Sequence, residues 1–238
     1  MKIVTNEKLI NRNKKIGQVT SIASLVVLGG GLYVSFTNTG TSTSPLAPFA
    51  TTITFAALIL GFLLSQVGIF YGNRWGRSPR PDERIIQSLK GLEDKYTFYN
   101  FTTNVPHLLV GPSGIWVLIP YTVKGLITYN EKKLRWQQKG GNFYMKFFAQ
   151  EGLGRPDLDA LGLIKDAEKY INENLKDIEH PQVQAALVFT NDKVAIEATN
   201  APIPTLPAGK LKDFFRKKAK EDPAPVETIK LLQAAFPK

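Results

Sequence analysis

Apolar and polar residues are distributed unevenly along this chain. No charged residue occurs between Ile16 and Asn73, whereas Lys, Arg, Asp and Glu recur throughout the remainder. The uncharged segment holds two apolar runs, Ile16–Phe36 and Phe49–Tyr71, separated by the polar residues 37–48. As a helix rising about 1.5 Å per residue, each run is long enough to cross a hydrocarbon core of about 30 Å. The pattern therefore predicts an integral membrane protein with two transmembrane helices joined as a hairpin.

A cleaved signal peptide is the alternative explanation of the first apolar run, because a basic segment precedes it. However, a second apolar run follows at once, and the first is longer than the core of a usual signal peptide. We therefore favour an uncleaved hairpin. The run Gly29-Gly30-Gly31 agrees with this interpretation, because small residues let a neighbouring helix approach closely within a membrane.

Basic residues flank the two runs on their outer sides. Residues 1–15 hold five Lys or Arg against the single acid Glu7, and Arg74, Arg77 and Arg80 follow the second run. The connecting loop has no basic residue. Because cytosolic flanks are enriched in Lys and Arg, we expect a two-span protein of the cell membrane with both termini cytosolic. In this scheme residues 1–15 are a basic cytosolic N-terminus, 16–73 are the membrane hairpin, and 74–81 are a linker.

Residues 82–238 alternate between helical and strand patterns. Ile85, Ile86, Leu89 and Leu92 fall at helical spacing and predict an amphipathic helix that begins near Asp82, where Pro81 suits the first turn. Short runs rich in β-branched and aromatic residues predict the strands Tyr96–Phe101, His107–Val110, Ile115–Ile119, Leu126–Tyr129, Leu134–Gln138, Val183–Thr190 and Val194–Glu197. Three further helices are predicted at 157–175, 209–220 and 225–236, with a Pro-rich connection at 201–207. This order predicts an α/β domain, a mixed β-sheet flanked by helices.

Composition narrows the chemistry. The chain has no Cys, which excludes disulfides and thiolate ligands or nucleophiles. Phosphate-binding glycine loops, nucleophile elbows and zinc motifs are absent from the sequence. The formal net charge of +10 is most simply explained by attraction to the anionic cytosolic leaflet, and nucleic acid is the second candidate partner.

Several segments of the domain follow the pattern of one known family. Val105–Val117 (VPHLLVGPSGIWV) has two strands around a Gly-Pro-Ser-Gly turn, Lys124-Gly125 opens a second hairpin, and Val183–Asn191 is a later strand. With Glu83 in the first helix, this order resembles the NERD domain, a nuclease-related domain allied to the PD-(D/E)xK restriction-endonuclease fold. The resemblance covers most of the chain after residue 82 and implies a restriction-endonuclease-like sheet.

The resemblance also implies a chemistry that this chain lacks the residues to perform. In the family an Asp and a Glu hold a divalent metal, and a Lys positions or activates the attacking water. Counted from the turn, these three positions hold Pro106, Ile119 and Tyr121 here, and a later Gln position falls on Asp159. Pro, Ile and Tyr cannot replace two carboxylates and an ammonium. We therefore expect a domain that keeps the fold without the reaction, and no cofactor.

Individual polar residues have structural explanations that we favour over functional ones. Glu83 lies in the first turn of a helix, where an acid interacts with the helix dipole. His107 borders a strand, and no carboxylate lies near it in sequence, so we expect a structural histidine. Asp157 and Asp159 lie at a helix start, where N-capping explains at least one of them.

Two basic segments are candidate binding surfaces. Lys132–Phe148 interleaves cations with aromatic residues, an arrangement that fits a core with a solvated face, a membrane surface or nucleic acid. Lys210–Lys220 is a basic amphipathic helix, which is usually a solvated face. The candidate nucleic-acid-binding or lipid-binding residues are Lys132, Lys133, Arg135, Lys139, Lys210, Lys212, Arg216, Lys217 and Lys218.

The leading hypothesis is a membrane-anchored, catalytically inactive NERD-like domain that acts as a binding or scaffold module at the cytosolic face. One alternative is a nuclease with a relocated site, in which Glu83, Lys124 and Asp159 converge around Mg²⁺. A second alternative is a structural subunit of a membrane protein complex whose anchor is the active part. The protein partner is not identified by the sequence.

Overall fold

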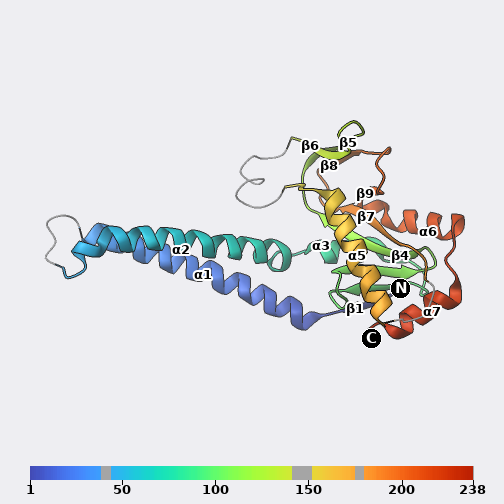
Figure 1. Cartoon of the computed structure of the whole chain (residues 1–238), viewed down its shortest axis with the longest axis horizontal. Coiled ribbons are helices and arrows are strands. Elements are labelled where there is room, and N and C mark those ends of the chain that lie inside the picture. The colour runs from blue at the N-terminus through green and yellow to red at the C-terminus, as the bar shows by residue number, and fades with distance from the viewer. Residues whose placement is uncertain (39–43, 141–151, 175–179, 238) are drawn as a thin grey trace. The chain divides into compact units, whose positions relative to one another are not determined.

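The computed structural model describes residues 1–38, 44–140, 152–174 and 180–237. The chain divides into two compact units. One is a helical hairpin, residues 7–80, and the other is an α/β domain formed by residues 1–6 together with residues 81–238. Figure 1 labels the elements of both units.

The hairpin unit consists of two long helices. The first, α1 (Glu7–Thr37), is followed by the short helix η1 (Ala47–Phe49) and by α2 (Ala50–Tyr71), which ends in a π-helical turn, η2 (Gly72–Gly76). In Figure 1, α1 and α2 run side by side. Both helices are long and apolar enough to cross a membrane. The two predicted helices are therefore confirmed, and α1 begins nine residues before the predicted Ile16 because its polar first turns are also helical.

Small residues let the backbones of α1 and α2 approach closely. A Cβ placed on Gly17 would lie 3.0 Å from the Cβ of Tyr71, and one placed on Gly31 would overlap Ala57. Two hydrogen bonds cross this interface: Ser24 Oγ donates to the Gly61 carbonyl at 2.8 Å, and Thr54 Oγ1 donates to the Gly31 carbonyl at 3.2 Å. Such contacts between small residues and hydroxyl-to-carbonyl hydrogen bonds are typical of helices packed within a membrane.

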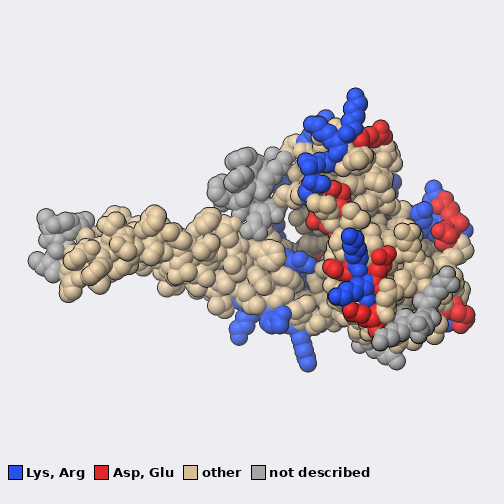
Figure 2. Space-filling model, viewed as in Figure 1, with Lys and Arg blue, Asp and Glu red and all other residues tan. Residues whose placement is uncertain are grey.

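The large apolar side chains of the hairpin point outward. Leu25 is 71% exposed, and the other exposed large side chains include Val19, Ile22, Val26, Leu32, Phe36, Phe55, Leu58, Phe62 and Leu63. Figure 2 shows the hairpin almost entirely free of Lys, Arg, Asp and Glu along most of its length. An uncharged surface of this kind is suited to lipid rather than to water.

The α/β domain contains four helices and nine strands among its described residues. The helices are α3 (Pro81–Leu89), α5 (Pro156–Asn174), α6 (Leu211–Glu221), which follows the short η3 (Ala208–Lys210), and α7 (Val226–Ala235). The strands are β1 (Lys2–Thr5), β2 (Thr97–Asn100), β3 (His107–Gly111), β4 (Gly114–Tyr121), β5 (Gly125–Asn130), β6 (Arg135–Lys139), β7 (Val183–Phe189), β8 (Val194–Glu197) and β9 (Thr205–Pro207).

These elements confirm the predicted helices and strands to within a few residues. Leu175, predicted as the last residue of the long helix, lies outside the described residues. Residues 141–148 of the predicted aromatic and basic segment also lie outside them. The predicted turn between the second and third strands is a two-residue loop, and Gly114 there has a φ of 98°, which L side chains rarely adopt. The fold class, a mixed sheet with flanking helices after two apolar helices, is confirmed.

The strands form two sheets. The larger has the order β1-β2-β3-β4-β7-β9, in which β2, β3 and β4 are antiparallel neighbours and β4 is parallel to β7. The smaller sheet has the order β6-β5-β8. Its strands β5 and β6 lie in the sequence between β4 and β7, whereas β8 follows β7, so the crossover that makes β4 and β7 parallel passes through the β5–β6 hairpin and α5.

Two segments of the large sheet were not predicted. Residues 1–15, expected to form a separate basic N-terminus, are divided between β1 and the first turns of α1. Lys2–Thr5 pairs in parallel with Thr97–Asn100. This pairing satisfies backbone hydrogen-bonding groups of β2 that would otherwise lie unpaired at the edge of the sheet. The Pro-rich connection likewise contains β9, which lies at the opposite edge, where proline is tolerated.

Helices cover both faces of the large sheet. Side chains of β4 alternate between the two faces, so Trp116 and Leu118 pack with α3 and α6, whereas Val117 and Ile119 pack with α5 and α7. On the first face Trp116 is 1% exposed and contacts Phe215 of α6 edge-on, with ring centroids 5.5 Å apart. The resulting three-layer core fixes where the ends of β4 and β7 lie.

Candidate functional site

The carboxyl ends of β4 and β7 lie side by side, because the two strands are parallel and Tyr121 is paired with Phe189. In open α/β sheets, ligand sites form at the carboxyl ends of parallel strands. Side chains from the first turns of α3 and α5 reach the same end of these strands. The carboxyl ends of β4 and β7 are therefore the candidate functional site.

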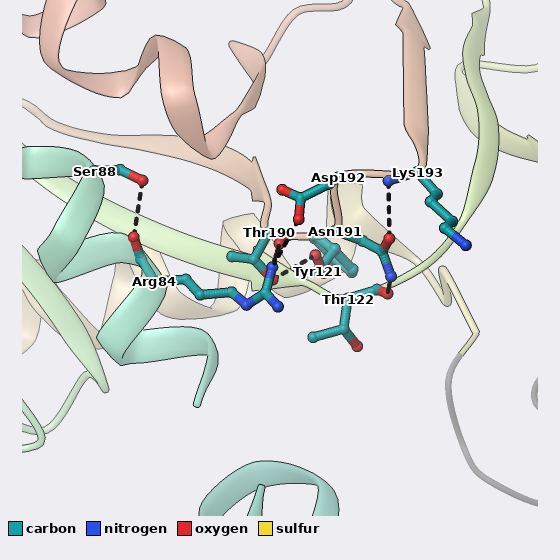
Figure 3. Close-up of polar contacts among 8 residues, drawn as sticks. All are labelled: Arg84, Ser88, Tyr121, Thr122, Thr190, Asn191, Asp192 and Lys193. Atoms are coloured by element: carbon teal, nitrogen blue, oxygen red, sulfur yellow. Dashed lines mark hydrogen bonds and ion pairs between the residues drawn. The ribbon is translucent and has the colours of Figure 1, made fainter. Parts of the chain in front are cut away.

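Hydrogen bonds tie the two strand ends together, as Figure 3 shows. The Thr190 amide donates to the Tyr121 carbonyl at 2.9 Å, and the Thr190 hydroxyl approaches the same oxygen at 3.3 Å. Asn191 Nδ2 donates to the Thr122 carbonyl at 3.0 Å. The loops after the strands are thus bonded to each other rather than open to a ligand.

Arg84 connects α3 to the carboxyl ends of these strands. Its Nη1 donates to the Thr190 carbonyl at 2.6 Å and lies 3.7 Å from the carboxylate of the exposed Asp192 (Figure 3). Ser88, one turn later in α3, donates to the Arg84 carbonyl at 2.8 Å. Sequence reasoning missed Arg84, because a charged residue on an amphipathic helix is usually solvated and nothing in the pattern indicates its partner.

Tyr121 and Asp159 form the central polar contact of the site. The Tyr121 hydroxyl donates to Asp159 Oδ2 at 2.9 Å, and its ring stacks on Phe189 with centroids 5.4 Å apart. Burial, and then the nearby negative charge of Asp159, raise the pKa of Tyr121 well above its ordinary value. The phenol therefore stays protonated near neutral pH and acts as a hydrogen-bond donor. It does not act as a base or as a cation.

Asp157 lies beside this pair and is held by Arg155. The guanidinium bonds the carboxylate through two nitrogens, at 3.1 and 2.7 Å, and this contact lowers the pKa of Asp157. The helix begins at Pro156, so both Asp157 and Asp159 lie in its first turn, and neither is the predicted N-cap. Both aspartates still stabilise the helix, because acids in a first turn interact favourably with the helix dipole.

The residues at the resembled catalytic positions do not form a metal site. Ile119 is buried in the apolar core under α5, and the Pro106 carbonyl, directly before β3, accepts a hydrogen bond from the Phe101 amide at 2.7 Å. Among the described residues, no group of three or more His, Asp or Glu side chains is arranged to hold a metal ion. The side chains at these positions therefore do not supply the set of oxygen ligands that Mg²⁺ requires.

The three residues of the relocated nuclease site lie on three different elements. Glu83 is half-buried in the first turn of α3, Lys124 is exposed just before β5, and Asp159 is in α5. Of these, Asp159 is bonded to Tyr121, while the Lys124 carbonyl accepts a hydrogen bond from Gln138 at 2.8 Å. The structure brings Asp159 to the strand ends with Tyr121.

A second polar cluster lies in the interior at the ends of β2 and β3. Asn100 donates to Asp82 at 2.9 Å through its amide nitrogen, and its amide oxygen lies 3.0 Å from His107 Nδ1. All three residues are buried, and the imidazole packs against Phe98 and Phe101. Because Asn100 bridges the carboxylate and the imidazole, the cluster is consistent with the structural role predicted for His107. Neither Asp82 nor Asn100 was identified as a candidate residue from the sequence pattern.

The two basic segments differ in how their charges are used. Lys132, Lys133, Arg135 and Lys139 of the β5–β6 hairpin are exposed, and none forms an ion pair within the described part of the chain. Lys132, Lys133 and Arg135 flank Leu134, which is 68% exposed and has a φ of 49°, whereas Lys139 pairs with Leu126 at the other end of the hairpin. Figure 2 shows Lys and Arg gathered over this hairpin, at the top of the view. The hairpin therefore presents cations around an apolar tip.

The cations of α6 are partly engaged within the domain. Arg216 donates to the Gly91 carbonyl at 2.9 Å, and Lys217 pairs with Glu221 at 3.5 Å. Lys212 and Lys218 are half-buried beside the inward-facing Phe215, while Lys210 is exposed just before the helix. This helix is therefore a charged outer face of the core, as expected for a basic amphipathic helix.

Comparisons with known proteins leave the domain without an assigned relative: no protein-family model, curated protein or solved structure matches the chain.

Proposed function

We propose that this chain is a membrane-anchored binding module, in which the helical hairpin holds a catalytically inactive, NERD-like α/β domain at the cytosolic face of the membrane. The proposal joins three elements: an anchor, a domain whose resembled nuclease positions are replaced, and a basic surface for an anionic partner.

The observation that carries the proposal is the hydrogen bond between Tyr121 and Asp159. The element order α3-β2-β3-β4-β5-β6-α5-β7 contains the first helix, the two strands around a turn, the later hairpin, the helix and the strand expected from the resemblance. In that scheme Tyr121 and Asp159 stand at the Lys and Gln positions, and they contact each other at 2.9 Å. A neutral phenol bonded to a carboxylate supplies neither a metal ligand set nor an ammonium for the attacking water.

Chain connectivity supports the placement of the domain on one side of the membrane. Residues that precede the hairpin form β1, and residues that follow it form α3, and both belong to the same α/β domain. If α1 and α2 cross the bilayer, both must therefore enter it from the side on which the domain lies. The basic residues that flank the hairpin favour the cytosolic side.

The β5–β6 hairpin is the favoured contact surface. Its four exposed cations are not neutralised by ion pairs within the described part of the chain, whereas Arg216 and Lys217 of α6 each contact a group of the domain. The exposed Leu134 adds an apolar contact at the centre of the charge. A surface of this kind attracts anionic partners, and its binding should weaken as salt rises.

The experiment is a binding titration with the full chain in nanodiscs of neutral lipid. We expect an anionic partner, probed with single-stranded DNA, RNA and a polyglutamate peptide, to bind with an affinity that falls steeply with salt. Lys132→Gln combined with Arg135→Gln should weaken that binding at least fivefold, whereas Lys210→Gln combined with Lys217→Gln should change it less than twofold. Equal losses in the two variants, or no binding to any probe, would contradict the proposed surface.

A nuclease assay on the same sample tests the catalytic part of the proposal. We expect no cleavage of DNA or RNA with Mg²⁺ or Mn²⁺ present. Metal-dependent cleavage that is abolished by Glu83→Gln or Asp159→Asn would overturn the proposal and establish the relocated nuclease site.

A further inference from the structure

An open cavity of about 510 Å³ lies within the hairpin unit, between the beginning of α1 and the end of α2. Its lining changes in character along the helices. Lys14 and Arg77 contribute cations, Gln18, Ser21 and Asn73 contribute uncharged polar groups, and Ile22 and Ile69 contribute apolar side chains. Asp and Glu are absent from the described residues that line it.

We propose that this cavity binds the phosphate of an anionic phospholipid, with the headgroup toward Lys14 and Arg77 and the first part of the acyl chains toward Ile22 and Ile69. The inference rests on the proposed function, because it requires the hairpin to lie in a bilayer.

The cations are suited to a phosphate. Lys14 comes from α1 and Arg77 directly follows η2, so the two charges reach the cavity from different helices. A lysine ammonium acts as a point charge, and an arginine guanidinium can bond two phosphate oxygens at once. Amide and hydroxyl groups of Gln18, Ser21 and Asn73 can bond further headgroup oxygens.

The gradient along α1 favours a lipid over a free phosphate. Lys14 and Ile22 are two helical turns apart, which is about 12 Å along the axis. Along the second helix, the sequence runs in the opposite sense from the apolar Ile69 through Gly72 to Arg77. A free phosphate would use only the cationic end, whereas a phospholipid would occupy both ends.

Aromatic residues place the cavity at the headgroup level. Tyr71 and Trp75 contact each other with ring centroids 5.1 Å apart, and the Arg74 guanidinium lies 5.0 Å from the centroid of the Trp75 ring. Tyr and Trp are enriched where a transmembrane helix meets the headgroups. The uncharged segment also ends at Asn73, within the cavity lining.

Glycines make room for the ligand. Gly17 packs against Tyr71, which holds the two helices together beside the cavity, while a Cβ on Gly72 or Gly76 would meet nothing within 4 Å. Both latter glycines line the cavity and bound the π-helical turn η2. Such turns occur frequently at functional sites. A larger side chain at Gly72 would enter the open space without changing any charge.

The test measures lipid binding to the full chain, purified in neutral detergent, by native mass spectrometry. The probes are phosphatidylglycerol, phosphatidylcholine and inorganic phosphate. We expect phosphatidylglycerol to be retained at least fivefold more than phosphatidylcholine, and inorganic phosphate at millimolar concentration not to displace it. Lys14→Gln combined with Arg77→Gln should abolish this preference, and Gly72→Leu should reduce it at least threefold.

Arg12→Gln combined with Lys15→Gln is the matched control, because it removes the same charge from the same end of α1 at positions outside the cavity lining. An equal loss in this control would overturn the proposal in favour of general surface charge. Equal retention of phosphatidylcholine, or displacement by inorganic phosphate, would overturn the lipid assignment as well.

Resistance of the full chain to alkaline carbonate extraction separates the two proposals. Extraction of the protein from the membrane would contradict the anchor and with it the proposed function. Retention in the membrane without any phosphatidylglycerol preference would contradict only the cavity assignment.

Discussion

The two units of this protein arrange the same residue types in opposite ways. In the hairpin, glycine, serine and alanine lie between the helices, and large apolar side chains such as Leu25 and Phe62 are exposed. In the α/β domain, Leu109 and Trp116 are buried, and the described charged residues other than Asp82 lie outside the core. In water, large apolar side chains are buried because removing them from water is favourable. In lipid this drive is lost, so close packing of small residues decides which side faces inward.

The difference indicates that the two units are matched to two solvents. A core of large apolar side chains, covered by helices on both faces, gives the α/β domain its stability in water. The described interface of the hairpin depends instead on close packing around glycines and on hydroxyl-to-carbonyl hydrogen bonds such as those of Ser24 and Thr54. Equivalent substitutions should therefore have different effects in the two units.

Truncation of a leucine should have the largest effect, and only in the domain. Leu109→Ala removes a side chain that is 0% exposed in the centre of the sheet and should lower the free energy of unfolding by about 2–5 kcal/mol. Leu25→Ala, at a position 71% exposed in the hairpin, should leave domain unfolding within about 0.5 kcal/mol of the original. Urea unfolding of the full chain in detergent, followed by tryptophan fluorescence, measures both values. Equal losses would contradict the proposed division into two solvents.

Introducing a lysine should have a large effect only in the hairpin, which is the reverse of the pattern expected for leucine truncation. Leu25→Lys places an ammonium near the middle of α1 and should disfavour membrane insertion by about 2.5–3.5 kcal/mol. Leu161→Lys, on the exposed side of α5, should leave both insertion and domain stability nearly unchanged. A glycosylation reporter in microsomes gives the inserted fraction of each variant. If Leu25→Lys inserted as well as the original chain, the outer surface of the hairpin would not face lipid.

Widening the helix interface should loosen the hairpin alone. A Cβ on Gly68 would overlap the Ser21 hydroxyl and lie only 3.1 Å from the Ser21 backbone nitrogen, so Gly68→Val should separate the helices at a cost of about 1–3 kcal/mol. Gly29→Val is the matched control, because a Cβ there meets nothing within 4 Å. Hydrogen exchange should become faster in α1 and α2 of the first variant and stay unchanged in β3 and β4. Faster exchange in Gly29→Val to the same extent would contradict the packing described.

Removal of the Tyr121 hydroxyl should have the smallest effect. Tyr121→Phe loses the hydrogen bond to Asp159 and should lower the free energy of unfolding by about 1 kcal/mol at neutral pH. Tyr99→Phe should cost less, because its hydroxyl is 3.5 Å from the Gln233 carbonyl. Urea unfolding at pH 7 compares the two variants, and a larger loss in Tyr99→Phe would contradict the central role of the Tyr121 contact.

The same tyrosines predict how stability depends on alkaline pH. Burial raises the pKa of Tyr99 to about 12, and it raises the pKa of Tyr121 further. Tyrosine in the unfolded chain ionises near pH 10, so above that pH the unfolded state loses protons that the folded state keeps. The free energy of unfolding should therefore fall as pH rises from 10 to 12. Each Tyr→Phe variant should show a shallower fall, and an unchanged slope would contradict the assigned shifts.

Elements with a strong periodic pattern could be predicted from the sequence. The apolar runs predicted α1 and α2, and the Gly111–Gly114 turn predicted the β3–β4 hairpin, because glycine tolerates the positive φ that Gly114 adopts directly after the two-residue loop. The helical spacing of Ile85 and Leu89 predicted α3 in the same way. In each case the signal is local, since it lies within the segment that adopts the structure.

Features that depend on distant partners could not be predicted. Lys2–Thr5 is too short to show a strand pattern, and it becomes a strand only because the edge of β2, more than 90 residues later, accepts it. The contacts of Arg84 with Thr190, and of Asn100 with Asp82, likewise join segments that are far apart in the chain. Tyr121 and Asp159 were each identified by counting from the resembled motif, but the hydrogen bond between them required the fold.

The central claim is that the hairpin spans the membrane and that the whole α/β domain lies on the cytosolic side. Since the chain has no cysteine, single cysteines can report the topology directly. We propose Glu7→Cys beside β1, Ser44→Cys between the two helices, and Lys132→Cys in the β5–β6 hairpin. In intact cells a membrane-impermeant maleimide should label only the variant at Ser44, and after lysis it should label all three. Labelling of the Glu7 or Lys132 variant in intact cells would contradict the account.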